Sequence, residues 1–311
     1  MKVKDGIIGH AIGDAMGVPV EFYKRDELSA NPVTTMLGYG SHDVPAGSWS
    51  DDTSMEIATI ASIVNKKGLD YEDMMMNFYE WLKDGLFTPY GEVFDAGRTC
   101  IQAIINFSKG YEWRECGLND KMSNGNGSLM RMLPLAYYCY YKKASLEEIY
   151  EIVKNASSLT HAHEISILGC YIYVNYVLFL LDEEDKFTAY HKLKNIDYSK
   201  FTSESLASYI NILEKDISKF PITSISSSGY IIDTLEASLW TILNTTNFEE
   251  SIIQAINLGE DTDTIGAITG SMSGIIYGYD TIPKSWLNKL AKRKDLENLC
   301  DEFASTLKEM K

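Results

Sequence analysis

Cysteine is scarce in this sequence, and the cysteines that are present lie far apart. They are Cys100, Cys116, Cys139, Cys170 and Cys300. Their number is odd, and no pair has the close spacing that is typical of structural zinc ligands. We therefore expect neither a disulfide framework nor a structural zinc site, and the pattern fits a reducing, cytoplasmic compartment.

Positive charge is also in short supply. The 311 residues include 28 lysines and arginines but 44 aspartates and glutamates, which gives a formal net charge of -16. Proteins that bind nucleic acid usually present a basic surface, so we expect no nucleic-acid partner. If the ligand is an anion, the local positive charge has to come from another source, such as bound metal ions.

Long hydrophobic segments are missing too. The longest apolar stretch, residues 167–181, is interrupted by Asn175 and is shorter than a membrane span, which indicates a buried core helix. The apolar stretch at the N-terminus is broken by His10 and Asp14, so we expect no signal peptide. The sequence therefore predicts no association with a membrane.

Proline is rare, and alternating strand patterns are absent. Most of the seven prolines fall between segments with the 3.6-residue periodicity of helices. The sequence thus predicts a single all-α domain over residues 1–311, in which the more polar residues 182–228 form a peripheral insertion or a cap. The expected helices cover residues 3–17, 53–66, 70–84, 93–108, 128–141, 145–157, 162–181, 203–218, 230–243, 248–258, 264–277 and 284–308, the last range as two helices.

Two of these helices carry glycine at every fourth position. One has Gly9, Gly13 and Gly17 on a single face, and the segment 265–278 repeats the pattern from Gly266 onward. Each glycine costs a helix about 1 kcal/mol relative to alanine. Such smooth faces predict two helices that pack backbone to backbone in the middle of a bundle.

Two acidic clusters stand out, GSWSDDTSM at 47–55 and NLGEDTDTIGAITG at 257–270. Each places carboxylates and hydroxyls in a loop that opens into a helix, where such residues are preferred caps. However, adjacent aspartates exceed what one cap requires. Hard oxygen ligands without imidazole or thiolate suit magnesium, manganese or calcium. A shared two-metal site, able to hold sugar hydroxyls and activate water, is the alternative interpretation.

Seven blocks make the sequence recognisable. They are GDAMGVPVEF at 13–22, WSDDTSM at 49–55, FDAGRTC at 94–100, GNGSLMRMLPLA at 125–136, LTHAHE at 159–164, SGYIIDTLEASLW at 228–240 and GEDTDTIGAITGSMSG at 259–274. In these blocks and their order, the sequence resembles the ADP-ribosylglycohydrolase family. That family includes the dinitrogenase reductase-activating glycohydrolases and the vertebrate ADP-ribosyl-acceptor hydrolases.

The resemblance implies a fold and a metal centre. The fold is an all-α orthogonal bundle, with two magnesium ions, or manganese, in a cleft. The family's metal ligands correspond by position to Ser50, Asp51, Asp52, Asp261, Asp263 and Thr264. Ser50 stands where the family usually has threonine, and it keeps the hydroxyl. Glu260 stands where the family often has glycine, so it either adds an acidic group beside the metals or points outward.

The resemblance also implies catalytic and substrate-binding residues. Glu21 and Asp95 correspond to acidic residues near the scissile bond or the acceptor side chain. On sequence alone, the preferred interpretation of Glu21 is a surface glutamate at a helix end, and Asp95 is alternatively the cap of the helix that follows it. The family pattern does not assign acid and base between them. The implied substrate-binding residues are Asn126, Gly127 and Ser128 for a diphosphate, His161 for the ribose-phosphate region and Tyr230 for stacking.

The implied reaction is hydrolysis of the glycosidic bond at C1″ of ADP-ribose, and arginine is the favoured acceptor. Hydrolysis of a free ADP-ribose derivative such as O-acetyl-ADP-ribose is one alternative, and a non-catalytic, crystallin-like relative is another. The complete set of six ligand positions argues against a non-catalytic protein. The expected partner is an ADP-ribosylated protein or a small ADP-ribose derivative, and we expect the protein to be a monomer.

Overall fold

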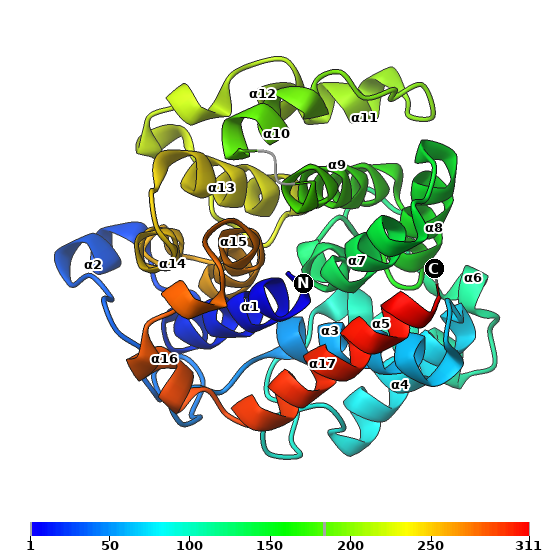
Figure 1. Cartoon of the computed structure of the whole chain (residues 1–311), viewed down its shortest axis with the longest axis horizontal. Coiled ribbons are helices and arrows are strands. Elements are labelled where there is room, and N and C mark those ends of the chain that lie inside the picture. The colour runs from blue at the N-terminus through cyan, green and yellow to red at the C-terminus, as the bar shows by residue number, and fades with distance from the viewer. Residues whose placement is uncertain (1, 183–184, 311) are drawn as a thin grey trace.

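The computed structural model describes residues 2–182 and 185–310 and is helical throughout (Figure 1). Within these ranges there is no β-strand, only two isolated bridges, Leu118–His161 and Gly125–Tyr230. The predicted all-α fold is therefore confirmed. The α-helices are α1 (Val3–Gly17), α2 (Arg25–Ala30), α3 (Asp51–Lys66), α4 (Tyr71–Asp84), α5 (Arg98–Ser108), α6 (Trp113–Cys116), α7 (Leu133–Lys142), α8 (Leu146–Ser158), α9 (Glu164–Leu181), α10 (Lys186–Leu193), α11 (Ser203–Ser208), α12 (Ile210–Leu213), α13 (Ile231–Asn244), α14 (Phe248–Ile256), α15 (Thr262–Tyr277), α16 (Lys284–Lys289) and α17 (Arg293–Glu309).

Short 3-10 helices connect several of these elements. They are η1 (Val18–Val20), η2 (Asn126–Arg131), η3 (Ile217–Lys219), η4 (Ile222–Ser224) and η5 (Tyr279–Thr281). The element η1 leads from α1 to Glu21, and η2 contains the buried polar residues Asn126, Ser128 and Arg131.

Helices α1 and α15 lie side by side in the centre of the molecule (Figure 1). Their glycines face each other, so that a Cβ added to Gly9 would overlap the carbonyl oxygen of Gly270. A Cβ added to Gly13 would likewise overlap the carbonyl oxygen of Gly266. The predicted backbone-to-backbone contact is therefore present.

Several helix boundaries differ from the predicted ones. Residues 93–97 are not helical, and α5 begins only at Arg98. The expected helix over 203–218 is broken into the short helices α11 and α12 and the turn η3. The segment at 128–141 is likewise divided, because Pro134 starts a new helix immediately after η2. The expected division of 284–308 into two helices is confirmed by α16 and α17.

Helix α9 has the length and apolar composition that could cross a membrane. In the protein, however, 78% of this segment is buried against other helices, as in the core of a bundle. Residues 186–228 follow α9 as short elements that run along one edge of the molecule, where they pack on α9 and α13 (Figure 1). The insertion predicted over 182–228 also includes residues 183–184, which lie outside the described residues.

Candidate active site

A cavity of about 370 Å³ lies where several helices begin. Its lining includes Asp51 at the start of α3, Arg98 at the start of α5, and Asp261 and Thr264 at the start of α15. The N-terminus of a helix presents unpaired backbone N–H groups and a partial positive charge, which favour carboxylates and anions. The fold thus directs several positive helix ends at one cavity.

Asp14, near the end of α1, organises the first acidic cluster. Its carboxylate accepts hydrogen bonds from the backbone N of Ser50 at 2.9 Å, and from the backbone N and hydroxyl of Thr53 at 3.0 and 2.6 Å. Ser50 in turn caps α3: its hydroxyl accepts from the backbone N of Asp52 at 3.3 Å and donates to Asp52 Oδ2 at 3.0 Å. Capping is therefore one role of this cluster, and it leaves other carboxylate oxygens free.

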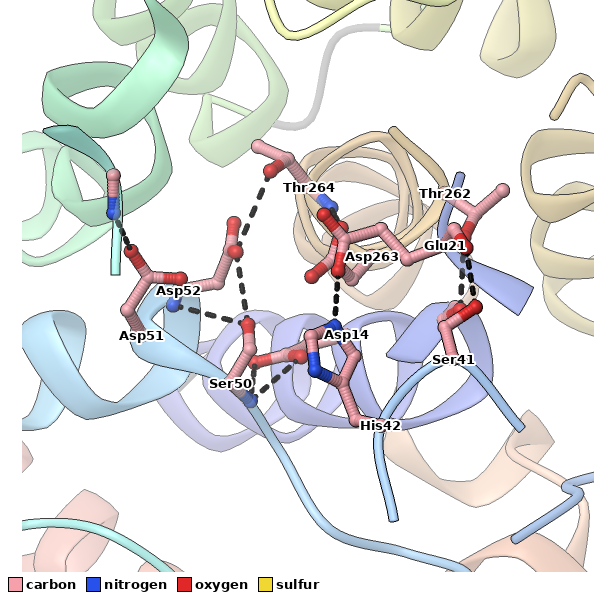
Figure 2. Close-up of polar contacts among 12 residues, drawn as sticks. Asp14, Glu21, Ser41, His42, Ser50, Asp51, Asp52, Thr262, Asp263 and Thr264 are labelled. Atoms are coloured by element: carbon pink, nitrogen blue, oxygen red, sulfur yellow. Dashed lines mark hydrogen bonds and ion pairs between the residues drawn. The ribbon is translucent and has the colours of Figure 1, made fainter. Parts of the chain in front are cut away.

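The two acidic clusters meet in space. The Thr264 hydroxyl donates to Asp52 Oδ2 over 3.4 Å, although 212 residues separate the two positions. Figure 2 shows side chains from α1, α3 and α15 pointing toward one another. Two groups of carboxylates have oxygens that all lie within 4.8 Å of one another, namely Asp14, Asp52 and Asp263, and Glu21, Asp261 and Asp263.

The carboxylates at this meeting point fit a cation site. Asp52 Oδ1 and Asp263 Oδ2 are buried and have no hydrogen-bond partner within residues 2–182 and 185–310. Burial, followed by neighbouring carboxylates, raises the pKa of Asp52 and of Asp263 well above the usual range, and burial raises the pKa of Asp14 to about 6. Ionised carboxylates that are buried and close to one another are unfavourable unless protons or cations neutralise their charge. An oxygen-only donor set suits hard divalent cations.

Glu21 lies beside this group and faces a histidine. Its Oε2 atom is 2.5 Å from His42 Nε2, and the Ser41 hydroxyl donates to its backbone carbonyl (Figure 2). The ring of His42 packs against Phe94, with ring centroids 5.2 Å apart. Burial raises the pKa of Glu21 to about 7, and the hydrogen bond to Glu21 raises the pKa of His42. Asp95 joins the pair, because one ligand atom from each of the three residues lies within 4.8 Å of the others.

Another part of the cavity wall is formed by residues 125–127. Asn126 ties this loop to the second acidic cluster, because its side-chain amide donates to Asp261 Oδ2 at 2.7 Å and to the Thr234 hydroxyl at 2.8 Å. Gly127 lets a histidine ring approach, since an added Cβ would lie only 3.0 Å from Cε1 of His161. His161 itself is buried and lines the cavity.

Comparison with known proteins identifies the family. The sequence profile of the ADP-ribosylglycohydrolases matches residues 1–310. The chain belongs to the ADP-ribosylglycohydrolase family. Its relatives are ADP-ribosyl glycohydrolase enzymes, so the cavity described above is a candidate active site of that class.

Relatives with assigned activities match nearly the whole chain. The ADP-ribosylarginine hydrolase Tri1 of Serratia proteamaculans is 31% identical over 304 residues, covering 97% of this chain and 78% of the relative. The ADP-ribosyl-[dinitrogen reductase] glycohydrolase of Rhodospirillum rubrum is 28% identical, covering 93% and 90%. A solved ADP-ribosylglycohydrolase-related protein complex superposes with a TM-score of 0.82 at 26% identity, covering 99% of this chain and 97% of that one.

Most of the residues expected from the ADP-ribosylglycohydrolase blocks come together at the cavity. Two do not line it. The Ser128 hydroxyl is fully buried and lies 3.1 Å from the Ser157 hydroxyl and 3.4 Å from Cys170 Sγ. Tyr230 lies at the rim, half-exposed and paired with Gly125 in an isolated bridge. Their roles as substrate contacts stay predictions.

Two residues of the site were not among the predicted ones. Asp14 sits inside the GDAMGVPVEF block, but its partners lie 36 and 39 residues away, which local patterns do not reveal. His42 precedes the first acidic cluster in an irregular loop. Glu260 is exposed with a φ of 61°, in the left-handed region that favours glycine, so this side chain points outward rather than joining the carboxylates.

Proposed function

We propose that this protein hydrolyses the bond between C1″ of ADP-ribose and a modified side chain, with the help of two divalent cations, Mg²⁺ or Mn²⁺. The observation that carries the proposal is the meeting of the two acidic clusters in one cavity, with buried carboxylate oxygens left without partners. A structural cluster of caps would satisfy its own oxygens, whereas a metal site keeps them available.

Six side chains are proposed as ligands of the cations. Asp51 and Asp52 would serve from the start of α3, and Asp261, Asp263 and Thr264 from the start of α15. Asp14 joins this set because its oxygens lie within 4.8 Å of those of Asp52 and Asp263. Ser50 is the weakest of the predicted ligands, because its hydroxyl already caps α3. Bound cations would neutralise the carboxylates and polarise sugar hydroxyls and water.

Glu21 and Asp95 are proposed to handle protons next to the scissile bond. Both line the cavity, and His42 lies between them as a hydrogen-bonding neighbour of Glu21. Glu21 is the stronger candidate for orienting the attacking water, because it belongs to the carboxylate group that contains Asp261 and Asp263. Asp95 is then free to face the acceptor side chain, where a carboxylate pairs well with a guanidinium.

The part of the wall formed by residues 125–127 is proposed to bind the diphosphate. Gly125, Asn126 and Gly127 line the cavity at the start of η2, and glycine lets an anion approach the backbone closely. Arg98, at the first turn of α5, is the only arginine or lysine among the described residues that line the cavity. It supplies positive charge that a protein with a net charge of -16 otherwise lacks there.

Arginine is the proposed acceptor. The relatives from Serratia proteamaculans and Pseudomonas putida are both named ADP-ribosylarginine hydrolases, at 31% and 29% identity over nearly the whole chain. The position of Asp95 beside Glu21 supports a cationic acceptor on this side of the cavity.

The test is release of ADP-ribose from defined substrates. We would incubate the protein with an ADP-ribosyl-arginine peptide, an ADP-ribosyl-serine peptide and O-acetyl-ADP-ribose, each with Mg²⁺ and with EDTA. We expect Mg²⁺-dependent release from the arginine peptide. Release from none of the three would contradict the hydrolase, release only from another substrate would contradict the acceptor, and release unaffected by EDTA would contradict the metal centre.

A further inference from the structure

Arg131 is a buried arginine whose hydrogen bonds go to neutral oxygen atoms. It is 2% exposed and donates to the carbonyl oxygens of Gly127 at 3.2 Å and Ala156 at 3.0 Å, and to the Thr160 hydroxyl at 2.9 Å. A guanidinium has five N–H donors and no acceptor, so the direction of each contact is fixed. Arg131 therefore supports the Gly125–Gly127 loop through the carbonyl group of Gly127, and it directs one N–H at the Thr160 hydroxyl.

The Thr160 hydroxyl accepts this hydrogen bond and has one proton of its own to give. His161 Nδ1 lies 2.7 Å from the hydroxyl oxygen. The Cys100 thiol is its other neighbour, but sulfur is a much weaker acceptor than a ring nitrogen. His161 Nδ1 is therefore the better acceptor for the hydroxyl proton, which favours the tautomer with a lone pair on Nδ1.

The other ring nitrogen then carries the hydrogen. Burial, together with the nearby Arg131, lowers the pKa of His161 to about 3, so the ring is neutral and protonated on a single nitrogen. The ring is 2% exposed and lines the cavity. Its Nε2 lies 3.6 and 3.7 Å from Cβ atoms added to Gly127 and Gly125, so this edge faces the loop. In the part of the chain that the structure describes, Nε2 has no hydrogen-bond partner.

We propose that Arg131 and Thr160 are positioning residues that hold His161 as its Nε2–H tautomer, so that the ring donates a hydrogen bond to an anionic oxygen of the ligand at the Gly125–Gly127 loop. This inference rests on the proposed function, which supplies the diphosphate as the anion. The opposite tautomer would present a lone pair to a phosphate oxygen and repel it. The Thr160 hydroxyl therefore determines affinity without touching the ligand.

The tautomer is measured first, without any ligand. The chain has five histidines, so nitrogen NMR of protein labelled with ¹⁵N-histidine gives few signals, and the His161→Gln variant identifies the one of interest. We expect the Nε2-protonated signature near neutral pH in the wild type, and a mixture of tautomers in Thr160→Val. An Nδ1-protonated ring in the wild type would overturn the inference.

Binding is measured next, by calorimetry with ADP-ribose, AMP and adenosine. Losing one hydrogen bond to a charged group should weaken binding about tenfold or more in Thr160→Val. Thr160→Ser, which keeps the hydroxyl, should bind as the wild type does. The loss should appear with ADP-ribose and AMP and not with adenosine, which lacks phosphate. An equal loss of affinity for adenosine would show that His161 does not donate a hydrogen bond to the phosphate, and it would contradict the inference.

Two controls separate positioning from general damage. Thr241→Val removes another buried hydroxyl, one without a hydrogen-bond partner among the described residues and remote from the cavity lining, and it should leave affinity unchanged. In a His161→Ala background, Thr160→Val should cause no further loss, because its effect passes through the ring. Fully additive losses would assign Thr160 a structural role only.

The steady-state kinetics distinguish this inference from the proposed function. Thr160→Val should raise KM with little change in kcat, because the contact is made in the ground state and the transition state alike. A wild-type protein that has the expected tautomer but binds no ADP-ribose would contradict the proposed function. A wild-type protein that cleaves its substrate with an Nδ1-protonated His161 would contradict only the role of Thr160 and Arg131.

Discussion

The two walls of the cavity differ in how their buried charge is compensated. The acidic wall presents Asp51 and Asp261 to the cavity and includes the buried carboxylates Asp14, Asp52 and Asp263 next to them. Two of its buried oxygens, Asp52 Oδ1 and Asp263 Oδ2, have no hydrogen-bond partner among the described residues. The glycine wall consists of Gly125, Asn126 and Gly127 with His161 and Arg131 behind them. Its buried cation, Arg131, has hydrogen bonds to carbonyl and hydroxyl oxygens.

This difference shows which wall depends on added ions. In the glycine wall the chain itself supplies hydrogen-bond acceptors to the buried guanidinium of Arg131. The acidic wall concentrates negative charge that the chain does not neutralise. Binding of the proposed anionic ligand would therefore use both walls, the acidic wall through its proposed cations and the glycine wall through its own N–H groups.

The largest expected effect comes from removing one carboxylate of the acidic wall. Asp263→Asn should lower kcat/KM by about 1,000-fold or more, because it removes a proposed ligand shared by both carboxylate groups. Assays with the ADP-ribosyl-arginine peptide would measure this. Asp280→Asn, an exposed acid on η5, is the matched control and should keep the wild-type rate. Wild-type activity in Asp263→Asn would place the metal centre elsewhere.

Cation binding should stabilise the fold through the acidic wall alone. At a Mg²⁺ concentration of about 100 times Kd, the free energy of unfolding should rise by about 2.7 kcal/mol. Thermal unfolding with Mg²⁺ and with EDTA would show the shift. Asp263→Asn should abolish the shift, whereas Thr160→Val should preserve it. A shift that survives in Asp263→Asn would mean that the cation binds somewhere else.

A buried carboxylate outside both walls, Glu236, should make the free energy of unfolding depend on pH without involving a cation. Burial raises the pKa of Glu236 on α13 to about 7, so folding loses stability as pH rises from the unfolded value of 4.5 toward 7. Glu236→Gln should therefore gain about 2 kcal/mol relative to the wild type between pH 5 and pH 8.

Urea unfolding at the two pH values would measure this gain. Mg²⁺ should not change it, because among the described residues Glu236 belongs to no group of three carboxylate or histidine ligands that could hold a cation. A gain that Mg²⁺ eliminates would mean that Glu236 also binds the cation, and an equal effect at both pH values would mean that its carboxyl does not titrate.

The smallest expected effect comes from the glycine wall. In Gly127→Ala the new Cβ would lie 2.7 Å from Cys100 Sγ and 3.0 Å from His161 Cε1, so the ring must shift. ADP-ribose should bind about tenfold more weakly. The stabilisation by Mg²⁺ should stay intact, and Gly68→Ala, at a remote helix end with room for a methyl group, should change neither. A Gly127→Ala variant that no longer binds Mg²⁺ would contradict the claim that only the acidic wall binds cations.

Periodicity predicted most helices, because most bury one apolar stripe that local sequence encodes. It failed where polar turns interrupt a helix, as at residues 203–218. It also missed the non-helical residues 93–97, in which the backbone N of Gly97 instead donates to Asp51 at 3.3 Å. Such boundaries are set by tertiary contacts that a local pattern does not contain.

The site was predictable where a motif carries its own chemistry. Paired aspartates indicate hard metal ligands. That the two acidic clusters meet in space depends on the packing of α1 against α15, and in the sequence only the family blocks indicated this meeting. Asp14 resembled an ordinary helix residue until its carboxylate was found against the start of α3. Ser128 is a different case: its hydroxyl lies in the core, whereas the predicted contact with a diphosphate concerns its backbone N–H and stays a prediction.

The glycine contact between α1 and α15 also limits how this protein can change. A Cβ on Gly17 would overlap the backbone of Asp263, and one on Gly13 would overlap that of Gly266. The separation of Asp14 from Asp263 is therefore fixed by the thickness of two main chains. The smallest side chain that can replace one of these glycines adds a whole methyl group, so the distance between the two carboxylates cannot change in smaller steps by substitution at these positions. Changes in the loops around the cavity therefore leave this central spacing as it is.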